Sequence, residues 1–275
     1  MSIITCIFYG FLSGIAEFLP VSSRAHQSLL LYLSGKMTRD PFLDLLVHIA
    51  VLFAILFFNK ATLSRLRVGE RRRSGHRQGR LRMQKIAYDS RLIRTASVPL
   101  IIGSMTYGAL MRYERNLVVL AVFLILNGII LLIAEHVRHG NADASTMSGL
   151  DGIVMGICGS MASFPGISRT GMITSYAVLR GAAYHHASNW AVVLAIPAMA
   201  VAIIMDVVSI ISVGFGFVTF SLIAGYFLGA VAAFGGTYIG ITFLRTILNR
   251  SGLSGFAYYS LGAALFTFIL YLIVW

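Results

Sequence analysis

Charged side chains are scarce in this sequence, and acidic ones are the scarcest. Only 12% of the 275 residues are charged, whereas a soluble domain has roughly 25%. Just 10 residues are acidic and 22 are basic, while 57% of the chain is hydrophobic. These proportions exclude an ordinary soluble domain and predict an integral membrane protein with many spans.

Cysteine is nearly absent too. Cys6 and Cys158 both lie in apolar runs, which excludes a disulfide framework and a cysteine-based metal site. Of the 22 basic residues, 12 lie between Lys60 and Arg94. Because no recognition motif accompanies them, we expect no nucleic-acid binding. We interpret this segment as a cytoplasmic loop that faces anionic lipid headgroups.

Proline is rare, with 5 residues, and two of the five interrupt apolar runs in the same way. The pattern Pro-x-x-Ser-Arg occurs at Pro20–Arg24 and again at Pro165–Arg169. Proline removes a backbone donor, and an arginine at bilayer depth costs at least about 2.5–3.5 kcal/mol. Irregular backbone at that depth is tolerated only inside protein or beside a wet cavity. Two such breaks predict one midplane site between two halves of the chain.

The apolar runs predict an all-α integral membrane protein, a helical bundle of two inverted repeats. Each repeat contains a re-entrant hairpin, with one motif at its tip, followed by three transmembrane helices. We assign one membrane domain to residues 1–275, with repeat 1 at 1–135, its basic loop at 60–91, and repeat 2 at 148–275. The expected spans are 42–59, 92–111, 117–135, 190–213, 217–245 and 256–275. With the basic loop in the cytoplasm, both termini lie outside.

The first motif brings several reactive side chains together. Glu17 precedes Pro20 by about one helical turn, and a carboxylate this deep is expected to face a cavity or a partner. The plainer alternative is an ion pair with Arg24 or Arg169. His26 beside Ser22 or Ser23 suggests nucleophilic phosphoryl transfer. In that reaction Glu17 orients the base or holds a divalent cation.

If the two tips meet, their side chains suit a phosphate group. Guanidinium forks match phosphate oxygens, and backbone amides of glycine-flanked turns cradle an anion. We therefore expect one set of residues to bind the substrate: Ser22, Arg24, Gly166, Ser168 and Thr170.

Other polar residues within spans are expected to be structural. We interpret His48 and Asn127 as interhelical hydrogen-bond partners, and we expect Asp206 to reach water at the outer end of its span. The glycines of one later segment predict close helix packing: Gly225, Gly229, Gly235, Gly236 and Gly240.

Two segments resemble the signatures of the undecaprenyl-diphosphate phosphatase family of bacterial membranes, also called the bacitracin-resistance family. The first signature is similar to residues Gly14–Ser23 and the second to residues Pro165–Gly171. Weaker matches occur at Asp44–His48, Leu194–Pro197 and Phe256–Tyr259, so the resemblance covers nearly the whole chain.

The resemblance implies an enzyme of the bacterial inner membrane that removes the terminal phosphate of undecaprenyl diphosphate on the outer face. The product is the monophosphate lipid carrier for peptidoglycan precursors. The resemblance also implies a divalent cation, magnesium or calcium, for which Glu17 is the candidate ligand. The family's catalytic set falls on Glu17, Ser23, His26 and Arg169.

The sequence departs from the family's pattern close to these residues. Ser13 stands where the family has a first glutamate, which weakens the metal site. Arg24-Ala25 replaces Thr-Gly, and Gly159 replaces a glutamine. An alternative function is therefore a non-hydrolytic binder or transporter (flippase) of a polyprenyl phosphate; hydrolysis of another lipid phosphate is a third. The expected partners are a polyprenyl diphosphate and membrane lipids, and the sequence leaves a homodimer open.

Overall fold

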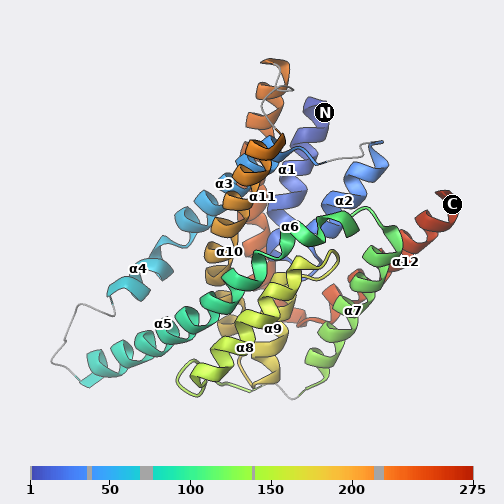
Figure 1. Cartoon of the computed structure of the whole chain (residues 1–275). Helices are drawn as coiled ribbons and strands as arrows, with labels where there is room; N and C mark the ends of the chain where they lie inside the picture. Colours follow the sequence, from blue (N-terminus) through green and yellow to red (C-terminus); the bar gives the residue numbers. More distant parts are fainter. Residues whose placement is uncertain (1, 36–38, 69–76, 138–139, 214–219, 275) are drawn as a thin grey trace.

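The protein is described from a computed structural model that covers residues 2–35, 39–68, 77–137, 140–213 and 220–274. Within these ranges the chain forms twelve α-helices. They are α1 (Ile3–Phe18), α2 (Ser23–Leu33), α3 (Pro41–Phe58), α4 (Lys60–Val68), α5 (Arg77–Ser104), α6 (Tyr107–Leu110), α7 (Leu117–His136), α8 (Gly149–Ser160), α9 (Arg169–Leu179), α10 (Tyr184–Val213), α11 (Phe220–Ser251) and α12 (Ser254–Val274). Figure 1 shows most of them gathered into one bundle, with α4 and the start of α5 extending away from it.

Five helices of the described ranges are long and apolar enough to cross a membrane. They are α3, α7, α10, α11 and α12. Shorter apolar helices occur at Ile3–Phe18 and Gly149–Ser163. The all-helical membrane architecture is therefore confirmed.

Both expected interruptions are present. α1 ends at Phe18 and the next residue, Leu19, is extended (φ −84°, ψ 145°), as a residue before proline prefers. In the second interruption Gly166 has a φ of +108°, which side chains disfavour. A Cβ at Gly166 would lie 2.9 Å from the backbone nitrogen of Leu124 on α7, so glycine is required there.

Two boundaries differ from the sequence-based expectation. The segment expected to be a basic loop at 60–91 is helical at α4 and through the first half of α5. Its straight-chain residues, such as Arg82, Met83 and Lys85, are good helix formers even without an apolar face. The span expected at 92–111 ends at Ser104, where a turn leads into α6.

Close helix contacts surround the two hairpins. α1 packs along α11, where a Cβ at Gly14 would lie 2.2 Å from the Ala233 carbonyl oxygen. α8 packs along α5, where a Cβ at Gly156 would lie 2.1 Å from the Ala96 carbonyl oxygen. α7 packs against α12, and α3 against α10. The hairpin helices α1 and α8 therefore each lie against a helix of the opposite half of the sequence.

Candidate functional site

The two interruptions are joined directly by hydrogen bonds. The Ser168 hydroxyl donates to the carbonyl oxygen of Leu19 (3.1 Å), and the Thr170 hydroxyl donates to the carbonyl oxygen of Glu17 (3.0 Å). Ser168 also caps α9, since its hydroxyl accepts from the backbone nitrogen of Gly171 (3.1 Å). The second tip is thus bound to the backbone of the first.

Asn127 on α7 connects the same two segments. Its amide nitrogen donates to the carbonyl oxygen of Pro20 (3.0 Å) and its oxygen accepts from the backbone nitrogen of Ser168 (2.9 Å). The nitrogen also donates to the Ser260 hydroxyl on α12 (3.0 Å). The expectation that Asn127 is an interhelical hydrogen-bond partner is confirmed, and the chain segments that it joins are the two motif turns.

A cavity of about 60 Å³ lies beside the joined tips, with walls from both halves of the sequence. Its lining residues are Ala16, Glu17, Ser23, Arg24, Gln27, Arg39, His48, Ser104, Tyr107, Gly159, Ala162, Ser163, Ile167, Ser168, Arg169, Ala198, Met199, Val201, Ala202 and Met205. The charged side chains among them are one carboxylate and three guanidiniums, and His48 adds an imidazole. This balance favours an anionic ligand.

Three of the four expected catalytic residues meet at this cavity. The Ser23 hydroxyl donates to Oε2 of Glu17 (2.5 Å), and Nη1 of Arg169 lies 3.0 Å from Oε1 of Glu17. The Arg169 side chain is only 5% exposed. Its Nε and Nη2 have no hydrogen-bond partner within the described ranges. Two such donors on a buried guanidinium suit an anionic ligand, because charge-assisted hydrogen bonds to an anion would satisfy them.

Arg24 reaches the cavity from α2. Its guanidinium lies 3.6 Å from the centre of the Tyr107 ring on α6, and its Nη1 donates to the Ser163 carbonyl oxygen (3.2 Å). A cation over an aromatic face is held by the ring's quadrupole. Arg24 therefore links the first tip to α6 and to the segment before the second tip.

The fourth expected catalytic residue, His26, is not among the cavity-lining residues. Its Nδ1 contacts the Ser22 carbonyl oxygen (2.8 Å) and its Nε2 contacts the Tyr259 hydroxyl on α12 (2.7 Å). The His26 and Tyr259 rings are stacked, with centroids 5.6 Å apart. The catalytic role of His26 stays a prediction, since both ring nitrogens are engaged away from the cavity in this structure.

Three expected substrate-binding residues also lie behind the cavity wall. Ser22 is buried and caps α2 through the backbone nitrogen of Ala25 (3.4 Å), Gly166 packs on α7, and the Thr170 hydroxyl is bound to backbone. Arg24 and Ser168 do line the cavity. Direct substrate contact stays a prediction for all five residues.

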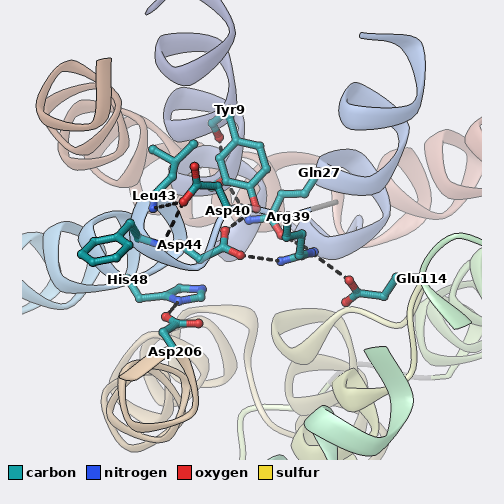
Figure 2. A network of polar contacts seen from close by, with 11 residues as sticks. Tyr9, Gln27, Arg39, Asp40, Leu43, Asp44, His48, Glu114 and Asp206 are labelled. Atoms are coloured by element: carbon teal, nitrogen blue, oxygen red, sulfur yellow. Dashed lines mark hydrogen bonds and ion pairs between the residues drawn. The ribbon is translucent and has the colours of Figure 1, made fainter. Parts of the chain in front are cut away.

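A second polar network borders the cavity, and sequence reasoning missed its centre, Arg39 (Figure 2). The Arg39 guanidinium lies between two carboxylates, 2.8 Å from Glu114 and 3.7 Å from Asp44. Its Nη2 also donates to the Gln27 amide oxygen (2.7 Å). The Tyr9 hydroxyl donates to Asp44. The available signal in the sequence was the small number of acidic residues. Acidic side chains close to membrane spans need a basic partner, and Arg39 is the partner of Glu114 and Asp44.

The network extends to Ser13. The Gln27 amide nitrogen donates to the Ser13 hydroxyl (2.7 Å), which itself donates to the Tyr9 carbonyl oxygen (2.5 Å). The position where the family has a glutamate is therefore connected to Arg39 through Gln27. Ser13 is buried and is not among the cavity-lining residues.

The histidine of α3 also lies in this region. Nδ1 of His48 is 2.6 Å from Oδ2 of Asp206 on α10 (Figure 2). The expectation that His48 is an interhelical partner is confirmed. The expectation that Asp206 reaches water is wrong, because the residue is buried and its carboxylate is bound to His48.

The described residues do not form a divalent-metal site of their own. Nowhere in the described ranges do three or more His, Cys, Asp or Glu side chains gather in a metal-binding cluster. Glu17 offers one carboxylate, and its two oxygens contact Arg169 and Ser23. Magnesium and calcium need six or more oxygen ligands. The expected cation stays a prediction, and no reaction step is derived through it.

Comparison with known proteins identifies the family of the chain. The family model of "Bacitracin resistance protein BacA" matches residues 6–266. The chain is 29% identical to an undecaprenyl-diphosphatase of Campylobacter concisus, with 99% of each chain covered. It is 27% identical to an undecaprenyl-diphosphatase of Alkaliphilus metalliredigens, over 94% of this chain and 95% of the relative. The family match spans both motifs, the whole of α3, α7, α10 and α11, and α12 up to residue 266, so this multi-pass membrane protein belongs to the BacA, or undecaprenyl-diphosphatase, family.

Proposed function

We propose that the protein removes the terminal phosphate of a polyprenyl diphosphate, undecaprenyl diphosphate in particular, in the cavity between the two tips. The observation that carries this proposal is Arg169. It is buried, it lines the cavity, and two of its donors are free beside the Ser23–Glu17 pair. The names of the relatives support a diphosphate substrate.

The three side chains have complementary roles in this reaction. The free donors of Arg169 bind oxygens of the terminal phosphate and stabilise the charge that develops on it. The Ser23 hydroxyl attacks the phosphorus, and Glu17 takes its proton through the existing hydrogen bond. The bond to the bridging oxygen breaks, and the lipid monophosphate leaves with the electron pair.

The alternative function uses the same cavity without hydrolysis. The walls come from α1, α2, α3, α5 and α6 in the first half of the sequence and from α8, α9 and α10 in the second half, which also suits a lipid-phosphate transporter with alternating access. Ser13, in place of a carboxylate, favours this reading. Product analysis separates the two functions.

The proposal also includes the architecture and the orientation of the protein: two inverted repeats, with the cavity open to the outer face of the membrane. α1 packs on α11, and α8 packs on α5. If the chain consists of two repeats, each hairpin helix therefore packs against a long helix of the other repeat. The start of α1 and the end of α12 both lie away from α4 (Figure 1). With the basic segment in the cytoplasm, the two termini are outside and substrate enters from the outer leaflet.

The direct test is Arg169→Lys in purified protein that is supplied with undecaprenyl diphosphate. Lysine keeps the charge but loses the planar fork, so kcat/KM should fall by about 100-fold or more. Arg180→Lys is the matched control, since Arg180 caps the C-terminal end of α9, the helix that begins at Arg169. The Arg180 side chain is 54% exposed and pairs with Asp151, which does not line the cavity. Wild-type phosphate release by Arg169→Lys would contradict the assignment.

A further inference from the structure

The cavity contains an imidazole that the motif residues do not provide. His48 lines the same cavity as Glu17, Ser23 and Arg169, although it belongs to α3 and lies outside both motifs. His26, the histidine of the motif, is engaged with Tyr259 instead. Among the residues that line the cavity, His48 is therefore the candidate for a neutral nitrogen base.

His48 is held in a defined orientation. Its Nδ1 is 2.6 Å from the carboxylate of Asp206, and the two side chains are only 15% and 9% exposed. The carboxylate accepts a hydrogen bond, so Nδ1 carries a proton, and in the neutral imidazole Nε2 keeps its lone pair. Nε2 has no hydrogen-bond partner in the described part of the chain, and the side chain borders the cavity.

The charges around His48 are balanced by other contacts. Figure 2 shows the ring pointing at Asp206, with Asp44 and Arg39 on its other side. Asp44 is bound by Tyr9 and Arg39, so neither Asp44 nor Arg39 provides a free base. Glu17 faces the cavity, but in the proposed function it already holds the proton that it took from Ser23, so it is not a base for the second step. Of these groups the imidazole alone offers an uncommitted lone pair.

We propose that His48, oriented by Asp206, is the general base that activates the water molecule which releases phosphate from Ser23. This inference rests on the proposed function, because it supplies the second half of that reaction. The cavity has room for water, and a serine–phosphate intermediate needs a base to be hydrolysed.

The step balances in atoms and electrons. The water oxygen forms a bond to phosphorus while the bond from phosphorus to Ser23 Oγ breaks, and Oγ takes back the proton held by Glu17. The proton lost by the water goes to Nε2 of His48 and is later released to solvent. The products are inorganic phosphate and the restored hydroxyl.

The key variant is His48→Gln. Glutamine can still donate to Asp206, so a purely structural link between α3 and α10 survives, whereas the base is lost. We expect kcat to fall by about 10²–10⁴-fold with a smaller change in KM. Phosphorylated Ser23 should accumulate, detected as a stable label from terminally ³²P-labelled undecaprenyl diphosphate.

Two further variants make the test specific. His48→Ala should regain activity with added imidazole, and Asp206→Asn should lower kcat because it favours the wrong tautomer. His136→Gln is the matched control, since His136 contacts the Leu132 carbonyl oxygen at the exposed end of α7. It should keep wild-type activity.

The outcomes separate this inference from the proposed function. An active wild type with an equally active His48→Gln would overturn the role of His48 alone. Loss of activity in folded His48→Gln without phosphoserine, and no rescue of His48→Ala by imidazole, would also overturn it. A wild type that releases no phosphate would overturn the proposed function, and the role of His48 with it.

Discussion

At the scale of single residues, we expect Ser13 and Arg24 to determine how strongly activity depends on a divalent metal. Ser13 lies one helical turn before Glu17, and Arg24 already brings a cation to the cavity wall. We expect Ser13→Glu alone to give little gain, since two neighbouring carboxylates repel unless a cation lies between them.

The double variant Ser13→Glu with Arg24→Thr should behave differently. It restores the second carboxylate and removes the competing cation, so phosphate release that depends on magnesium or calcium should rise by at least about tenfold. The measurement is phosphate release against metal concentration for wild type, both single variants and the double variant. A double variant that is insensitive to metal would contradict this account of Ser13.

The residue scale also shows what sequence alone could predict. Pro20 and Pro165 mark the interruptions because each begins the pattern Pro-x-x-Ser-Arg, whereas Pro99 and Pro197 lie inside the helices α5 and α10. The repeated pattern therefore allowed the meeting of Glu17, Ser23 and Arg169 to be anticipated. The bond between His48 and Asp206 joins positions 158 residues apart, and nothing local specifies it. Arg39 was missed for the same reason, since four α-helices, α3 to α6, separate it in the sequence from its partner Glu114.

At the scale of elements, the contact between α1 and α11 positions the first tip. Sequence predicted close packing for the glycines of α11, and it is present at Gly229, Gly236 and Gly240. It is absent at Gly235, where a Cβ would meet nothing within 4 Å among the described residues. The glycine content of a helix does not show which face of that helix contacts its neighbour, so the exception at Gly235 could not be predicted.

Gly14→Ala tests this contact. Its Cβ would lie 2.2 Å from the Ala233 carbonyl oxygen and 2.9 Å from the Thr237 backbone nitrogen, so the two helices must separate. We expect a cost of about 1–3 kcal/mol, seen as a lower Tm in detergent, together with reduced activity because Glu17 moves with α1. Gly235→Ala is the control and should leave the Tm unchanged or slightly raised. Equal Tm values for the two variants would contradict the packing argument.

At the scale of the whole molecule, the two ends of α7 should face opposite sides of the membrane. Arg115 precedes α7 and Ser145 follows it, and both are exposed. In a variant without Cys6 and Cys158, an impermeant thiol reagent added outside intact cells should label Arg115→Cys and spare Ser145→Cys. The reverse labelling pattern would contradict the assignment of the basic segment to the cytoplasm.

The account as a whole depends on whether the lipid diphosphate is cleaved. The most direct measurement incubates purified wild-type protein in nanodiscs with undecaprenyl diphosphate and quantifies lipid monophosphate and inorganic phosphate together. The account predicts one monophosphate and one phosphate for each diphosphate consumed, with both products lost in Arg169→Lys. Recovery of intact diphosphate that is bound to the protein, with no phosphate at any magnesium or calcium concentration, would contradict it and favour a lipid-phosphate binder or transporter.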